Sequence, residues 1–95
     1  MVTIGMNYRV LPGKESVFEA ACARVLDALR GADGHDHSQL YRAVDGPEYL
    51  IVSRWTDEAA FRGFVASEAF RKVTSWGSEH ILAGPPRHTT YREGA

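Results

Sequence analysis

One asparagine and one glycine near the N-terminus are the first residues whose types and spacing could do chemistry. Asn7 lies in a run of alternating apolar and polar residues, where asparagine is disfavoured, and Gly5 lies two residues earlier on the same face. The glycine leaves space beside the amide, and an amide facing a cavity can donate a hydrogen bond to a developing oxyanion or to dioxygen. Alternatively, Asn7 satisfies a neighbouring backbone group and Gly5 marks a β-bulge.

Aromatic side chains are concentrated in the second half of the chain. Such a concentration would suit a flat aromatic ligand held between a helix and a sheet. Packing in the core explains most of these residues equally well, and least so those at an expected helix bend, Phe64 and Trp76. The aromatic candidates are Trp55, Phe61, Phe64, Phe70 and Trp76.

Histidines supply the remaining candidates. In His35-Asp36-His37, two imidazoles two residues apart on a strand point the same way and could share a metal ion with a third ligand such as His88. These polar residues more simply begin an edge strand in water, so we expect no metal site. His80 could act as a base near neutral pH, or it could be a solvated residue at a helix end.

Composition limits the class of protein. The 95 residues fit one domain, spanning 1–95, and 44% apolar with 24% charged residues is typical of a globular chain. The net charge of -1 gives no broad attraction to nucleic acid or anionic lipid. Without a membrane-spanning apolar run or signal-peptide pattern, we expect a cytoplasmic protein. The single Cys22 falls on an apolar helical stripe, and we expect it to be buried rather than reactive.

Hydrophobic periodicity predicts the elements that position these residues. Alternation favours strands, and apolar residues at helical spacing favour helices. The expected elements before residue 55 are a strand over 2–10, a helix over 14–30 that stops at Gly31, and strands over 35–44 and 48–54.

The stretch from Tyr49 to Phe61 reads as a strand that runs directly into a helix. Thr56 is expected to cap that helix, with Asp57 and Glu58 at the positive end of the helix dipole. Ser67 is a second cap candidate, which predicts a break or bend near it. A fourth strand is expected over 87–92.

The order β-α-β-β-α-β predicts an α+β fold, with helices on one face of an antiparallel four-stranded sheet. The other face then needs a partner, and we expect a symmetric homodimer. The apolar residues available for the interface are Ile4, Met6, Tyr8, Tyr49 and Ile51. Alternation alone does not fix which strand face meets the helices.

Over nearly its whole length the chain resembles the antibiotic biosynthesis monooxygenase (ABM) domain family. The resemblance rests on the opening strand with Asn7, on Leu40-Tyr41-Arg42, on the run from Tyr49 to Phe61, and on Ser67-Glu68-Ala69-Phe70-Arg71. It implies a ferredoxin-like fold that pairs into a dimeric α/β barrel. The family is similar in shape across members that oxidise phenols or quinols without a cofactor, degrade heme, or have no assigned reaction.

For the heme-degrading branch, the resemblance implies an Asn on the first strand, a Trp on the second helix and a His about ten residues further on. Asn7 fits the first position. The Trp position falls on Phe64 and the His position on Thr74, so the expected iron ligand is absent unless His80 substitutes. We therefore favour a protein without heme.

For the cofactor-independent branch, the resemblance implies that a deprotonated substrate passes an electron to dioxygen while the protein positions both. Asn7 would then hydrogen-bond the substrate or the reduced oxygen, and His80 or Tyr41 would accept the proton. The pocket would be walled by Trp55, Phe64, Phe70 and Trp76. The function predicted is oxidation of a small aromatic phenol or quinol, and the alternative is a dimeric ligand-binding domain without turnover.

Overall fold

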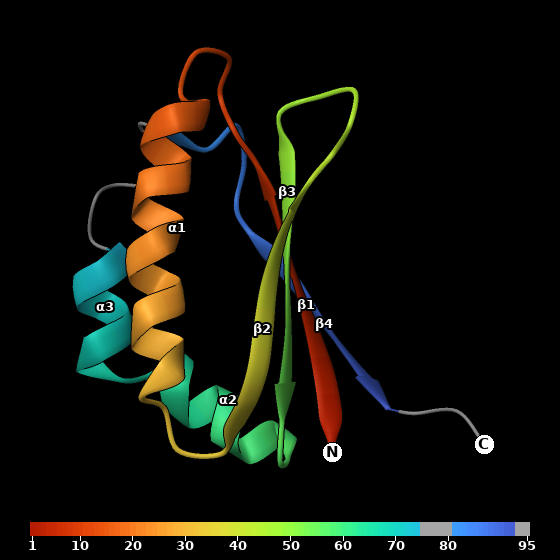
Figure 1. Cartoon of the computed structure of the whole chain (residues 1–95), viewed down its shortest axis with the longest axis vertical. Coiled ribbons are helices and arrows are strands. Elements are labelled where there is room, and N and C mark those ends of the chain that lie inside the picture. The colour runs from red at the N-terminus through yellow and green to blue at the C-terminus, as the bar shows by residue number, and fades with distance from the viewer. Residues whose placement is uncertain (75–80, 93–95) are drawn as a thin grey trace.

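Helices cover one face of a four-stranded sheet and leave the other face open (Figure 1). The computed structural model describes residues 1–74 and 81–92. Its elements are β1 (Val2–Arg9), α1 (Glu15–Arg30), β2 (His35–Arg42), β3 (Glu48–Trp55), α2 (Glu58–Val65), α3 (Glu68–Thr74) and β4 (Arg87–Arg92). This arrangement confirms the predicted ferredoxin-like α+β fold.

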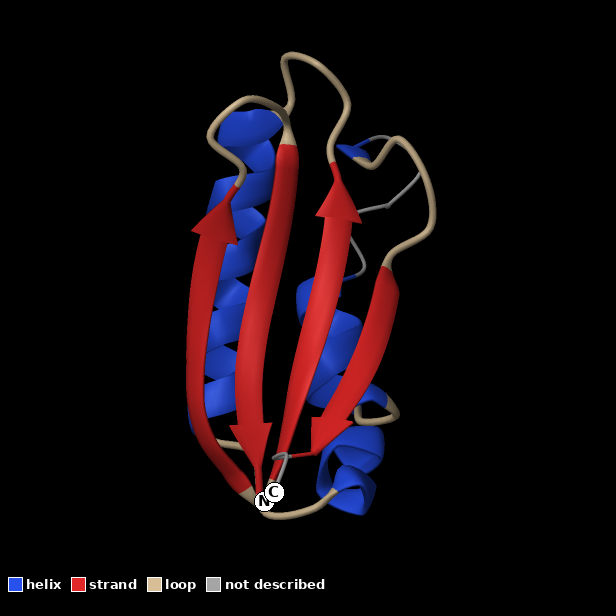
Figure 2. Ribbon diagram, turned by 90° about the vertical axis from the view of Figure 1, so that its right-hand side faces the viewer, coloured by secondary structure: helices blue, strands red, loops and turns tan. Residues whose placement is uncertain are grey.

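The strands lie in the order β2-β3-β1-β4, and every neighbouring pair is antiparallel. Figure 2 looks onto the open face, with the helices behind the strands. The first strand is therefore central, and the last strand lies at an edge beside it. Residues at matching ladder positions of β1, β3 and β4 consequently share a face.

The helix-covered face holds the core. Ile4, Met6 and Tyr8 of β1 are at most 8% exposed, as are Tyr49 and Ile51 of β3. The prediction that these five residues form a dimer interface is wrong, because they pack beneath the helices of their own chain. Burying them there removes apolar surface from water without any partner.

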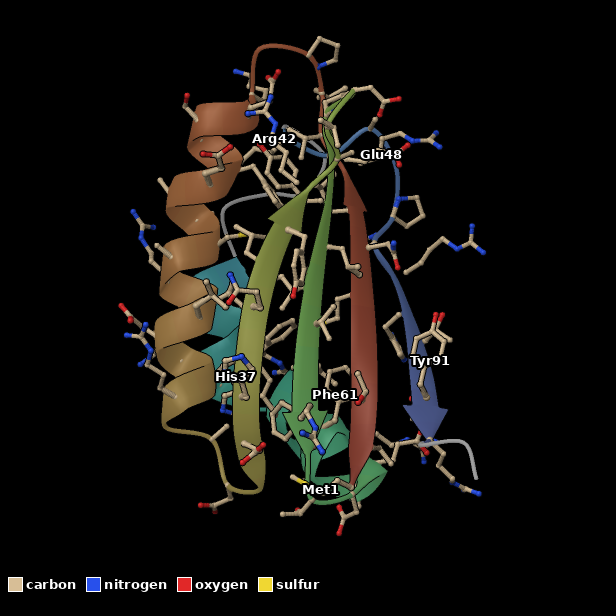
Figure 3. All side chains as sticks on the ribbon, turned by 45° about the vertical axis from the view of Figure 1, so that its right-hand side comes forward. Met1, His37, Arg42, Glu48, Phe61 and Tyr91 are labelled. Carbon is tan, nitrogen blue, oxygen red and sulfur yellow. The ribbon has the colours of Figure 1, made fainter. Side chains whose placement is uncertain are left out.

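The open face carries the alternate residues of the same strands. Two of its rows, read from β2 through β3 and β1 to β4, are Tyr41, Leu50, Asn7 and Arg87, then Gln39, Val52, Gly5 and Thr89. In the next row lies Tyr91, which with Tyr41 is more than half exposed. Figure 3 shows Tyr91 projecting from β4 on the side away from the helices.

The second helical region begins and bends close to the predicted positions. Asp57, rather than Thr56, is the N-cap, because its Oδ1 accepts the Ala60 N–H at 2.8 Å. The Thr56 N–H instead donates to the Gly34 carbonyl at 2.8 Å. Ser67 separates α2 from α3 and accepts the Phe70 N–H at 3.2 Å, as predicted.

Candidate functional site

The aromatic candidates form a cluster between the sheet and the helices α2 and α3. Trp55 lies at its centre, fully buried, with ring centroids 5.7 Å from Phe61 and 5.6 Å from Phe64. Phe64 contacts Phe70 at 5.2 Å, and Phe70 is only half-buried. The cluster therefore has a closed centre and a partly open end.

Trp55 is a structural anchor. Its indole Nε1–H donates to the Ser53 hydroxyl at 2.9 Å, and Ser53 is itself fully buried. A buried indole N–H without an acceptor would be costly, so the serine two residues earlier on the strand satisfies it. The sequence reasoning did not single out Ser53, although its period-two spacing from Trp55 places both on one face.

Two histidines flank the aromatic cluster from opposite edges of the sheet. On β2, the His35 ring lies 5.2 Å from Trp55 and its Nε2 is 2.5 Å from the Ser38 hydroxyl. Burial lowers the pKa of His35, against an opposing influence of the Asp36 carboxylate. On β4, the exposed His88 ring lies 5.4 Å from Phe61.

The expectation that the imidazoles of His35 and His37 point the same way is wrong. A β-bulge between them shifts the register, so that His35 pairs with Trp55 and His37 pairs with Arg54. The first imidazole consequently lies on the helix-covered face and the second on the open face. Among the residues that the structure describes, no group of three His, Cys, Asp or Glu side chains could hold a metal ion.

Asn7 does not join the aromatic cluster. It is exposed on the open face, whereas Trp55 and Phe64 lie across the sheet on the other face. The predicted pocket in which Asn7 faces these aromatics is therefore wrong. Asn7 instead lines a groove of about 470 Å³ together with Tyr8, Arg9, Glu48, Tyr49, Gly84, Pro85, Arg87 and Thr89.

The remaining predicted site residues are separated as well. Tyr41 lies on the open face, two strands away from Asn7 on the same row. Trp76 and His80 lie outside the described residues, so their roles stay predictions. His88, considered from the sequence only as a third metal ligand, is the imidazole that the fold brings to the accessible side of the aromatics.

Buried groups on the helix-covered face are held in their protonated forms. Cys22 is 2% exposed, as expected. Burial, and to a lesser degree the nearby Glu19 carboxylate, raises the pKa of its thiol to about 12. Burial likewise raises the pKa of the Tyr8 phenol. Neither group is an available nucleophile or base near neutral pH.

The chain belongs to the antibiotic biosynthesis monooxygenase family, whose family model matches residues 1–76. A relative from Natronomonas pharaonis, named "Putative heme-binding protein NP_2262A", is 37% identical over 87 residues, which are 90% of this chain. The matched region is only 14% of that longer protein.

Solved structures share the fold. SnoaB from Streptomyces nogalater, described as a cofactor-independent oxygenase, superposes with a TM-score of 0.84 at 23% identity, covering 99% of this chain and 93% of that one. The protein Rv0793 from Mycobacterium tuberculosis gives 0.86 at 19% identity, covering 99% and 95%. Within the part of the chain that is described, no helix is long and apolar enough to cross a membrane.

Proposed function

We propose that this protein oxidises a small aromatic phenol or quinol with dioxygen and without a cofactor. Family membership supports a monooxygenase role, and the described fold is shared with a cofactor-independent oxygenase. The observation that carries the proposal is His88, an exposed imidazole lying against Phe61 at the accessible side of the aromatic cluster.

The chemistry needs a base and an apolar surface side by side. His88 takes the phenolic proton, since imidazole is the side chain suited to proton transfer near neutral pH. The phenolate then gives one electron to dioxygen, and the resulting radicals combine at a ring carbon. Overall, phenol plus dioxygen gives quinone plus water, so the substrate supplies all the electrons.

Phe70 is half-buried and provides a surface on which a substrate ring can pack, whereas Phe61 is buried as part of the wall. Phe61 bridges the two parts of the site, because its ring contacts both Trp55 and His88. Its helix is tied to β4 by Glu58, which accepts a hydrogen bond from the Thr90 hydroxyl at 2.8 Å. That bond fixes the distance between the aromatic wall and the strand that carries His88.

The test measures oxygen uptake after anaerobic mixing with a panel of hydroquinones. We expect His88→Gln to lower the rate by about 100-fold, the lower range of a lost general base. His37→Gln, which changes an imidazole on the opposite face, is the matched control and should keep wild-type activity. Equal oxygen uptake by wild type and His88→Gln would show that His88 takes no part in the reaction.

Two further variants separate this site from the sequence-based alternatives. Asn7→Ala should keep most of the activity, because Asn7 lies on the far face of the sheet from Phe61. If His80→Gln abolishes uptake while His88→Gln does not, the base is the residue predicted from the sequence. Absence of uptake in wild type over a broad panel would favour a ligand-binding domain without turnover.

Heme binding is the second candidate, favoured by the name of the Natronomonas pharaonis relative. The donor chemistry of the described residues fits, because His88 is an exposed imidazole beside an apolar ring. His88 would hold the iron, and the heme would supply redox chemistry that the side chains lack. Hemin titration tests this: a Soret shift lost in His88→Ala supports it, and an unshifted band in wild type rejects it.

We also propose that a second copy of the chain covers the open face of the sheet. Leu50 and Val52 form an apolar centre there, and Tyr41 and Tyr91 are more than half exposed to either side. A Cβ on Gly5 would lie 3.4 Å from the Tyr91 ring and 3.5 Å from Leu50, so both side chains cover the glycine. Leu50, Val52 and Tyr91 thus form an apolar strip across β3, β1 and β4, with polar residues such as Asn7 and Thr89 beside it.

Light scattering after gel filtration tests the dimer. We expect wild type at twice the chain mass, and Val52→Glu as a monomer, because a buried unpaired carboxylate in the interface is strongly unfavourable. Val17→Glu places the same charge on an exposed site of α1 and should remain dimeric. A monomeric wild type at high concentration would contradict this assembly.

A further inference from the structure

The bulge in β2 brings a serine and a histidine together on one face of the sheet. In a regular strand, residues three apart point to opposite faces. The extra residue between His35 and His37 changes this alternation. His35 therefore lies opposite Trp55 and Ser38 opposite Ser53, both on the helix-covered face. The His35 Nε2 and the Ser38 Oγ consequently lie 2.5 Å apart.

His35 is in a suitable state to act as a base toward this hydroxyl. Burial lowers the pKa of its imidazole, so the ring is neutral near neutral pH and can take a proton. The ring also has a hydrogen bond with the backbone of His37, which helps to fix its orientation. A serine hydrogen-bonded to a base that a further group orients is the arrangement that activates the hydroxyl in acyl transfer.

The pair lies at the rim of the sheet, where a small molecule can reach it. Among the described strands, β2 is at an edge and has β3 as its neighbour. His35 and Ser38 are both half-buried, so neither side chain is sealed in the core. Because they lie on the helix-covered face, a second copy of the chain packed on the open face would not lie over them.

The backbone of β2 supplies a donor for the negative charge that develops in acyl transfer. In an antiparallel ladder, alternate residues direct their N–H toward the neighbouring strand, and the residues between them direct it away. The Ala43 N–H donates to the Glu48 carbonyl of β3 at 2.8 Å. Ser38 is an odd number of residues before Ala43, so its N–H points away from β3 to the edge of the sheet. A carbonyl oxygen held at the Ser38 hydroxyl can accept a hydrogen bond from this N–H.

We propose that Ser38 and His35 hydrolyse small aryl esters. The Ser38 Oγ forms a bond to the ester carbonyl carbon while its proton passes to the His35 Nε2. The bond from that carbon to the phenolic oxygen then breaks, and the departing phenol takes the proton. A water molecule, deprotonated by the same imidazole, releases the carboxylic acid and restores the serine. Aryl esters suit this pair because a phenolate leaves readily with little assistance from an acid.

The first experiment mixes the full chain with para-nitrophenyl acetate and follows the release of para-nitrophenolate. We expect Ser38→Ala and His35→Gln each to lower the rate by about 100-fold, the lower end of the range for a lost general base. His37→Gln removes an imidazole two residues away on the opposite face and is the matched control, with an unchanged rate. Equal rates in wild type and Ser38→Ala would overturn the proposal.

Mass spectrometry of the acid-quenched reaction adds a readout that does not depend on the rate. We expect one acetyl group at Ser38, on the tryptic peptide 31–42, in wild type and none there in His35→Gln. Ser38→Cys keeps a nucleophile beside the imidazole and should be acetylated at the same position, whether or not Ser38→Ala folds. Acetyl groups confined to other residues in wild type would contradict the assignment of Ser38 as the nucleophile.

Discussion

The two faces of the sheet are built from the same strands but differ in what their residues do. On the helix-covered face, alternate β3 residues such as Tyr49, Ile51 and Trp55 are at most 3% exposed. On the open face, Leu50 and Val52 are only half-buried and Asn7 is exposed. The covered face therefore holds the core of the chain, whereas the side chains of the open face remain partly or fully exposed.

The largest expected effect that tests this comparison comes from Trp55→Ala. Truncating a fully buried tryptophan should cost about 3–5 kcal/mol of unfolding free energy. Val52→Ala, on the same strand but on the open face, should cost less than about half of that. Urea denaturation of both variants measures the difference. Similar losses at the two sites would mean that the open face is as tightly packed as the covered one.

Two glycines, Gly34 in the turn before β2 and Gly5 on the open face of β1, give the next comparison. Gly34 has φ +83° and a Cβ there would approach the Ala60 Cβ to 2.6 Å, so Gly34→Ala should cost about 2 kcal/mol from strain and clash. At Gly5 the nearest atoms lie at ordinary contact distances of 3.4 and 3.5 Å. Gly5→Ala should therefore change the melting temperature little. A larger loss at Gly5 than at Gly34 would contradict this ranking.

Removing the N-cap of α2, a short helix on the covered face, should have a smaller effect on stability. Asp57→Ala removes the acceptor of the Ala60 N–H and should cost about 1 kcal/mol. Thr56→Ala tests the cap predicted from the sequence and should cost less. Thermal unfolding of the pair decides which residue caps the helix, and a greater loss in Thr56→Ala would reverse the assignment.

The smallest expected effect concerns the pH dependence of stability. It should depend on His35 and not on His37. Burial lowers the pKa of His35 below its ordinary value of 6.5, so the unfolded chain binds a proton more readily than the folded one. Stability should thus be complete above pH 6.5 and decline as the pH falls below it. His35→Gln should flatten this decline, and His37→Gln should not. Equal slopes of stability against pH in the two variants would show that burial of His35 on the covered face does not cause the decline.

Much of the fold follows from local sequence patterns. Alternation placed β1 and β3, helical spacing placed α1, and Ser67 marked the break between α2 and α3. The face that meets the helices could not be assigned, because β3 is apolar on both sides: Ile51 on one, Leu50 and Val52 on the other. That single ambiguity led to the wrong interface and to the wrong pocket for Asn7.

Other features depended on contacts that spacing does not encode. The bulge between His35 and His37 reverses one imidazole relative to the other, and a single extra residue in the pairing is enough to do so. Thr56 and Asp57 are neighbours with similar capping preference, so the sequence did not separate them. Arg87 faces Asn7 only through the β1 and β4 pairing, which brings together residues 80 positions apart in the chain.

Chemical labelling of Cys22, the single cysteine, can report how often α1 separates from the sheet. A thiol reagent can modify it only after α1 has moved off the sheet and the thiol has lost its proton, because the side chain is 2% exposed and its pKa is raised. The labelling rate at a fixed pH therefore measures how often the covered face is exposed to solvent. A ligand that clamps the aromatic cluster should slow this labelling.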